Sequence, residues 1–252
     1  MKRRMHHLLQ GDGRVLIVAM DHAGFSDKPL PGLTHPGELI ETVVAGGADA
    51  ILTTFGTARL YAKQLGSAAL MLSVNTTNPL LEKAVEEALI IGADAVKCMV
   101  YPGLQGDANG VVGAQRLGAD CLRWGMPFVP ETIPGGFQGS AEFRTPEKIA
   151  GGARVGQECG GDLIKTFYTG SPDTFKVVTD NVGIPVVILG GPKMDTDEDL
   201  LKVVKGMIDG GGAGVAFGNN IWRHTHPAKI TAAVAAIIHD GATVAQALKK
   251  LQ

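Results

Sequence analysis

The chain has 252 residues, enough to bury a large core, so one domain over residues 1–252 is the simplest expectation. Its formal net charge is only −2 and the charged residues are spread along it, which argues against a nucleic-acid partner and favours a small molecule. The three cysteines, Cys98, Cys121 and Cys159, lie far apart, which argues against a disulfide framework or a zinc knuckle and fits a reducing cytoplasm.

The opening segment, MKRRMHHLLQ, is basic but reaches GDGRV before an apolar core of signal-peptide length has formed. No apolar run approaches the roughly 20 residues of a membrane span. We therefore expect a soluble cytoplasmic protein that makes no contact with membranes.

Short β-branched or aliphatic runs recur along the chain, and each is followed by a stretch with helical periodicity. They lie at residues 15–22, 48–56, 69–75, 93–103, 127–133, 162–170, 185–193 and 213–220. A doubly wound sheet would stop at five or six strands, whereas eight β/α units without a break in composition favour a (β/α)₈ TIM barrel.

A weak internal repeat introduces these runs. The tetrapeptides GGAD, IGAD, CGGD and GGAG stand before the second, fourth, sixth and eighth of them. Glycine ends the preceding helix there, and small residues allow a tight return into the barrel floor.

The helical stretches carry ordinary start and stop signals. One is predicted from Asn78 as N-cap and Pro79 in the first turn to Gly92 as its stop. The last segment, GATVAQALKKLQ, predicts an additional short amphipathic helix for packing or subunit contact.

In a (β/α)₈ barrel the reacting groups come from the C-terminal ends of the strands and the loops after them. That rule nominates Asp21, His22, Thr53, Thr54, Asn75, Lys97, Glu131, Lys165, Tyr168, Gly190, Gly191, Lys193 and Gly218.

Lys165 is the most informative of these, because lysine is seldom buried in a strand unless it is paired. It is either a salt-bridge partner of Asp21 or Glu131, or a nucleophile that forms a Schiff base. A free lysine is protonated at neutral pH, so the second role needs desolvation or a neighbouring cation, for which Lys97 and Lys193 are candidates.

Schiff-base carbon–carbon chemistry also needs a group that moves protons. Asp21 and Glu131 are the carboxylates at hand, and His22 and Tyr168 are the other candidates. Each has an alternative structural role: a carboxylate neutralises lysine, and His22 forms part of the wall.

Glycines stand near the ends of the seventh and eighth runs, a pair in ILGGPK and a single one in VAFGNN. Loops at these places in such barrels commonly bind phosphate, and Gly190, Gly191 and Gly218 would let backbone N–H groups approach the anion. His224 and His226 lack a third ligand and stand before Pro227, which predicts the start of a helix and no metal site.

Four motifs, AMDHAGF, GGDLIKTFYTGSPDTF, ILGGPK and GVAFGNNIW, resemble in order and spacing the archaeal-type class I fructose-bisphosphate aldolases. Relatives of that family act on autoinducer-2 phosphate or make aminodideoxyheptulosonate. The resemblance covers nearly the whole chain. It implies a (β/α)₈ barrel, a Schiff base on Lys165, a supporting Asp21, a phosphate site around Gly190, Gly191 and Gly218, and often a decamer.

Two positions depart from this family. Its tyrosine proton donor would fall at Ile133, which cannot donate a proton, so Glu131, two residues earlier on the same strand face, is the expected replacement and His22 the second. The family's phosphate-binding arginine falls at Asn219, followed by Asn220, and asparagine carries no charge. The substrate is thus expected to be a ketose or a ketose-phosphate-like molecule, bound in part by Lys97, Tyr168, Lys193 and Asn219.

The leading hypothesis is a class I aldolase that needs no metal or organic cofactor and works as a homo-oligomer. A second hypothesis keeps Lys165 but makes the reaction a thiolase-like acyl transfer on a phosphorylated diketone. A third is a non-catalytic sugar-binding barrel.

Overall fold

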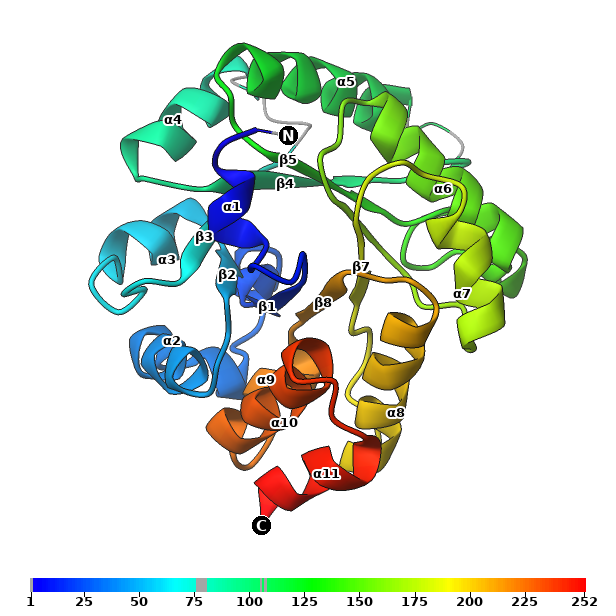
Figure 1. The fold of residues 1–252 in the computed structure, drawn as a ribbon. Coiled ribbons are helices and arrows are strands. Elements are labelled where there is room, and N and C mark those ends of the chain that lie inside the picture. The colour runs from blue at the N-terminus through cyan, green and yellow to red at the C-terminus, as the bar shows by residue number, and fades with distance from the viewer. Residues whose placement is uncertain (1, 76–80, 105, 107) are drawn as a thin grey trace.

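The computed structural model describes residues 2–75, 81–104, 106 and 108–252, and its strands close into one parallel barrel in chain order (Figure 1). The strands are β1 Val15–Ala19, β2 Ala50–Thr53, β3 Ala69–Ser73, β4 Ala95–Val100, β5 Phe128–Thr132, β6 Ile164–Thr166, β7 Val186–Leu189 and β8 Gly214–Phe217. Every predicted run contains one of them. The predicted (β/α)₈ TIM barrel is confirmed.

Most helices surround the barrel and follow the strands in turn (Figure 1). They are α2 Pro36–Ala45, α3 Phe55–Leu60, α4 Ala84–Ile90, α5 Ala108–Arg123, α6 Pro146–Glu158, α7 Pro172–Thr179, α8 Asp197–Asp209 and α10 Pro227–His239. A short α11, Val244–Leu248, packs on α8 and α10, as the predicted additional helix would. Of the described residues, none belongs to a helix that is long and apolar enough to cross a membrane.

Local sequence explains where these helices begin. The side-chain oxygens of Thr145, Ser171 and Thr196 accept a backbone N–H in the first turns of α6, α7 and α8. Proline opens α10 at Pro227, as predicted, because the first turn needs no N–H from that residue. Asn78 and Pro79, the predicted start of another helix, lie outside the described residues.

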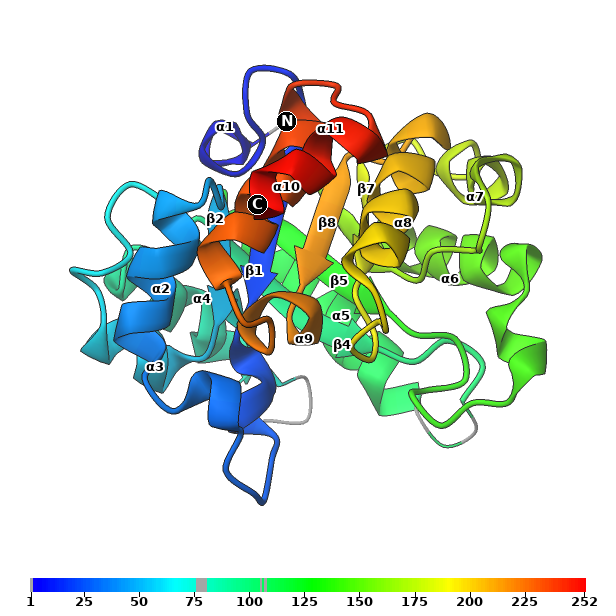
Figure 2. The same cartoon turned by 90° about the horizontal axis from the view of Figure 1, so that it is seen from below.

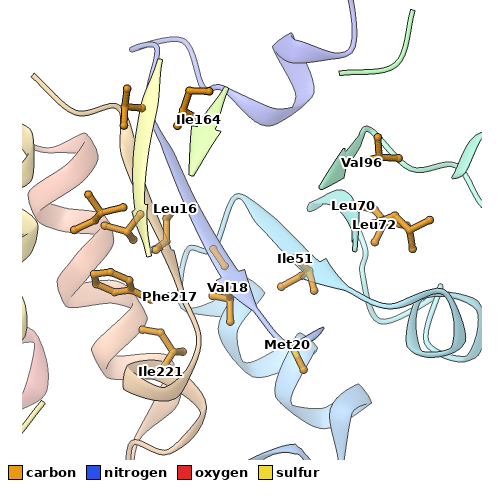
Figure 3. Packing of buried hydrophobic residues seen from close by; sticks show 14 of the residues in the cluster. Leu16, Val18, Met20, Ile51, Leu70, Leu72, Val96, Ile164, Phe217 and Ile221 are labelled. Carbon is orange, nitrogen blue, oxygen red and sulfur yellow. The ribbon is translucent and has the colours of Figure 1, made fainter. Parts of the chain in front are cut away.

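Side chains alternate across each strand and form two apolar layers. Outward-facing residues, among them Leu16, Val18, Ile51 and Phe217, pack between the strands and the helices (Figure 3). Inward-facing residues form a second cluster inside the barrel, in which alanines such as Ala50 leave room near the axis.

The N-terminal segment covers the floor of the barrel, the end where the strands start. The short helix α1, Met5–Leu8, lies there in Figure 2, while α9, Asn219–Trp222, lies at the opposite end. Met5, Leu8 and Leu9 are buried within the inner apolar cluster. The N-terminal segment therefore closes the floor of the barrel with its apolar side chains.

The GGAD-type repeat has a structural cause on that floor. An aspartate stands just before β2, β4 and β6, and its carboxylate accepts a backbone N–H near the start of the preceding strand. These bonds join Asp49 to Leu16 (2.6 Å), Asp94 to Leu70 (2.9 Å) and Asp162 to Phe128 (2.9 Å). Each carboxylate thus fixes the register between two neighbouring strands: β1 and β2, β3 and β4, or β5 and β6.

The eighth strand breaks this pattern for a steric reason. Gly214 has a φ of +146°, and a Cβ on it would lie 1.9 Å from the carbonyl oxygen of Val15. Because β8 closes the barrel against β1 at this point, only glycine fits where the other units carry aspartate.

A basic side chain from outside the strands contacts each of these aspartates. Lys2 Nζ lies 2.8 Å from Asp162 and His7 Nδ1 lies 2.8 Å from Asp94. His239, at the end of α10, bridges Asp49 (2.9 Å) and Asp12 (2.8 Å). Both terminal regions of the described chain are therefore held against the floor.

We expect His239→Gln to destabilise the protein in a pH-dependent way. Hydrogen bonding to Asp49 and then to Asp12 outweighs burial and raises the pKa of His239 to about 9. Because this exceeds the unfolded pKa of roughly 6.5, the stabilisation is complete below that pH and is lost as pH rises through the folded pKa.

In urea unfolding, the free energy of unfolding of His239→Gln should be about 1 kcal/mol lower than that of the wild type near pH 6. This difference should become smaller as the pH is raised to about 10. His6→Gln, at an exposed position on α1, is the control. A deficit that stayed constant across this range would contradict the bridge.

Candidate active site

Lys165 is the middle residue of β6 and points into the barrel. Its neighbour Ile164 belongs to the outer apolar layer, and Thr166 donates its hydroxyl to the carbonyl of Thr132 at 3.0 Å. Strand alternation therefore directs Lys165 inward, where its side chain is only 6% exposed.

Glu131 is the direct partner of Lys165. The two residues are opposite each other in the β5–β6 register, and Lys165 Nζ lies 2.8 Å from Glu131 Oε1. The predicted alternative of a salt bridge from Lys165 to Asp21 or Glu131 is thus realised with Glu131. An ion pair does not exclude a nucleophilic role, because the carboxylate that holds the ammonium can also accept its proton.

Lys97 links Glu131 to Asp21. Its Nζ lies 2.7 Å from Glu131 Oε2 and 2.9 Å from Asp21 Oδ2, and it donates to Ser73 Oγ at 3.2 Å. The order Asp21, Lys97, Glu131, Lys165 forms what we call the buried charge chain. Two cations and two carboxylates make it electrically neutral, which is the condition for keeping charges away from water.

The charge chain stays ionised despite its burial. For Asp21 and Glu131, burial alone would raise the pKa, but the charges of Lys97 and Lys165 outweigh it and hold both pKa values below their usual range. For Lys97, burial would lower the pKa, but Glu131 and Asp21 raise it above the ordinary value. Lys97 is therefore a permanent cation beside Glu131.

His22 lies next to the buried charge chain, in the 3₁₀ turn Asp21–Gly24 after β1. Its Nδ1 lies 3.8 Å from Asp21 Oδ1 and is buried, with no hydrogen-bond partner in the part of the chain that the structure describes. Its ring meets Trp222 edge-on at 5.5 Å and lies over Gly218, where a Cβ would come within 2.3 Å of His22 Cε1. Burial lowers the pKa of His22, so the imidazole is neutral at neutral pH and free to exchange a proton.

A cavity of about 490 Å³ opens at the C-terminal ends of the strands. Asp21, His22, Glu131 and Lys165 lie on its wall, whereas Lys97 sits behind them, 1% exposed. Phenylalanines at positions 25, 137 and 167 add an apolar surface. The predicted catalytic residues are thus brought together in one place.

The glycine-containing loops that follow β7 and β8 form one side of the cavity. Gly190, Gly191, Gly218 and Asn219 all line it. Asn219 donates to the carbonyl of Gly191 at 3.3 Å, and the buried Asn220 donates to that of Gly190 at 3.0 Å. The two asparagines therefore tie the β8 loop to the β7 loop.

Besides Lys97, which sits behind the wall, two further residues predicted to bind substrate lie outside the cavity. The ring of Tyr168 packs on Phe175 at 5.4 Å, and its hydroxyl points at α8, 2.2 Å from the place that a Cβ of Gly206 would take. Lys193 is exposed on the loop after β7. Neither is among the described residues that line the cavity, and neither is Ile133, which is fully buried.

Arg144 lines the cavity and was missed in the sequence. It ends a 3₁₀ turn, Ala141–Arg144, in the loop between β5 and α6. This segment follows a strand, but Arg144 stands twelve residues beyond the end of β5, far from the strand-end positions that the rule singles out. A lone arginine before a helix cap carries no signal of its own.

Comparison with known proteins places this site in a family. A sequence model of the "DeoC/LacD family aldolase" group matches residues 15–224. The class 1 fructose-bisphosphate aldolase of Thermoproteus tenax is 32% identical over 94% of each chain. The 2-amino-3,7-dideoxy-D-threo-hept-6-ulosonate synthase of Halobacterium salinarum is 31% identical over 95% of this chain and 92% of its own.

Solved structures agree with the sequence relatives. An archaeal fructose 1,6-bisphosphate aldolase superposes with a TM-score of 0.83 at 30% identity, covering 95% of this chain and 99% of that one. An archaeal aldolase whose catalytic lysine carries the carbinolamine intermediate gives 0.82 at 30% identity, over 94% and 98%. The chain therefore belongs to the DeoC/LacD family of aldolases and is a class I, Schiff-base-forming carbon–carbon lyase.

Proposed function

We propose that Lys165 forms the Schiff base and that Glu131 moves its proton. The observation that carries this is the 2.8 Å contact between Lys165 Nζ and Glu131 Oε1 on the wall of the cavity. Of the described lysines, only Lys165 lies on that wall. Lys97 sits behind, its ammonium held between Glu131 and Asp21, and a permanent ammonium is no nucleophile.

The cleavage begins when Glu131 accepts a proton from Lys165 and the neutral amine attacks the ketone carbonyl of the substrate. The carbinolamine loses water, and the resulting iminium withdraws the electron pair of the neighbouring carbon–carbon bond. The bond between the α and β carbons breaks as a base takes the proton of the hydroxyl on the β carbon. That carbon then leaves as the aldehyde product. The enamine left on Lys165 is protonated at carbon and then hydrolysed, restoring the amine.

Glu131 is the first candidate for the base and His22 the second. Glu131 lies beside the nitrogen that becomes the iminium. His22 is a neutral imidazole on the same wall, whose Nδ1 has no hydrogen-bond partner among the described residues. Lys97 acts behind them by keeping Glu131 ionised, and Asp21 holds Lys97 in place.

The proposed substrate is a phosphorylated ketose in the cytoplasm. Gly190, Gly191 and Gly218 would present backbone N–H groups to a phosphate on the donor half, and Asn219 would add an amide. The Thermoproteus tenax relative is named as acting on fructose bisphosphate, which supports this class of substrate. A homo-oligomer is part of the same proposal.

Borohydride trapping tests the proposal. The protein is incubated with fructose 1,6-bisphosphate, fructose 1-phosphate, dihydroxyacetone phosphate or dihydroxyacetone, reduced, digested and mapped by mass spectrometry. We expect a stable adduct on the peptide that contains Lys165, and none on the exposed Lys193. An adduct elsewhere, or none with any of these ketones, would refute the assignment.

The acyl-transfer alternative needs its own measurement. Product analysis with and without coenzyme A separates it from aldol cleavage, since only acyl transfer consumes the thiol. If acylated coenzyme A were found, acyl transfer would take the place of the cleavage step described above, and the Schiff base would remain.

A further inference from the structure

We propose that Arg144 binds an anionic group on the aldehyde half of the substrate, an inference that rests on the proposed function. The group is a phosphate or a carboxylate at the end of the substrate remote from the glycine loops. The argument combines the charge balance of the cavity, the way Arg144 is held and its position relative to Lys165.

The charge balance leaves Arg144 without a counterion. The buried charge chain is neutral within itself, and His22 is uncharged at neutral pH. Among the described residues, Arg144 has no carboxylate within ion-pair distance. The cavity therefore carries one net positive charge, which favours an anionic ligand.

The guanidinium of Arg144 is held in place before any ligand arrives. Nη1 donates to the carbonyl of Pro134 at 2.5 Å and Nη2 to that of Gly136 at 2.6 Å. Its plane lies over the ring of Phe167, with Cζ 4.3 Å from the ring centroid. Two of its five N–H groups are used, and three remain for a ligand.

The loop that holds Arg144 has the glycines this requires. Gly135 and Gly136 have φ angles of +71° and +77°. A Cβ on Gly135 would lie 2.4 Å from the ring of Phe143. The PGGF segment thus turns its carbonyls toward Arg144, and a side chain fixed in this way loses little further entropy on binding.

Position decides which half of the substrate Arg144 meets. Arg144 follows β5 and lies over Phe167, just after β6, whereas the glycine loops follow β7 and β8. Lys165 on β6 stands between these two sides. A ketose anchored by its donor half at the glycines, with its carbonyl at Lys165, can extend its remaining carbons across the cavity to Arg144.

The test compares three aldehyde acceptors in the synthetic direction with dihydroxyacetone phosphate as donor. They are D-glyceraldehyde 3-phosphate, succinic semialdehyde and neutral D-glyceraldehyde. We expect the wild type to prefer one anionic acceptor, and Arg144→Gln to lower kcat/KM for that acceptor by about 10- to 100-fold, mainly through KM. The neutral acceptor should change by less than about 3-fold.

Two controls separate anion binding from a purely structural role. Arg144→Lys should restore part of the preference, because it keeps the charge without the planar fork. Arg154→Gln, which removes an exposed arginine paired with Glu158 on α6, should behave as wild type. A wild type without preference for an anion, or a parallel loss on all three acceptors, would overturn the proposal.

A binding measurement makes the outcome independent of turnover. Borohydride first fixes dihydroxyacetone phosphate on Lys165, so the glycine loops are filled, and inorganic phosphate and succinate are then titrated calorimetrically. Arg144→Gln should weaken the preferred anion at least about 10-fold, and equal affinities would refute the role of Arg144. If no adduct forms, the proposed function fails separately, and the same comparison is made on the unmodified protein.

Discussion

Lys165→Arg is expected to abolish carbon–carbon bond cleavage, lowering kcat by at least about 10⁴-fold, because the variant removes the nucleophile of the reaction. Arginine keeps the positive charge beside Glu131, so the buried charge chain stays balanced and the barrel should fold. A guanidinium does not lose its proton, and therefore cannot form the carbinolamine. Activity and borohydride trapping should disappear together.

Lys193→Arg is the matched control, since it makes the same substitution at an exposed lysine outside the cavity lining. It should keep wild-type kcat and trapping. Circular dichroism and the unfolding midpoint verify that Lys165→Arg remains folded. Residual trapping by the folded variant at wild-type level would show that another lysine carries the intermediate.

Glu131→Gln is expected to lower kcat by about 10²- to 10⁴-fold, because it removes the group that accepts the proton of Lys165. It also leaves Lys97 and Lys165 with Asp21 as the remaining carboxylate of the charge chain. Losing a partner of a buried cation costs about 3 to 5 kcal/mol, so the free energy of unfolding should fall as well.

The two effects are separated by measuring stability and the pH dependence of kcat on the same samples. Glu131→Asp keeps the charge on a shorter side chain and should recover most of the stability but little of the activity. If Glu131→Gln retained wild-type kcat, His22 would be the acid–base group. His22→Gln should then remove the ionisation seen in the kcat profile.

Much of the fold could be predicted because local sequence patterns determine its strands and helix starts. Each of the eight strands lies inside its predicted run, since a buried parallel strand needs a short apolar segment bounded by polar or glycine residues. Pro227 opening α10 is a similar local signal. The neighbourhood of Lys165 and Glu131 also followed, because both stand near the ends of adjacent strands.

What the sequence concealed depends on long-range packing. The orientation of Tyr168 is set by Phe175 and α8, and no strand-end rule reveals it. Arg144 becomes part of the site only because the loop at Pro134 and Gly136 folds back to hold it. The assembly into oligomers, the cytoplasmic location, the single-domain boundaries and the individual site roles stay predictions.

The floor of the barrel has a consequence for how the enzyme can diversify. On the sixth unit, Asp162 secures the strand to Lys2 and to the backbone of Phe128, and only three positions later Lys165 enters the cavity. One end of this short segment anchors the scaffold while the other carries the chemistry. Because these contacts lie at the floor, side chains at the mouth that select the substrate can change without breaking them.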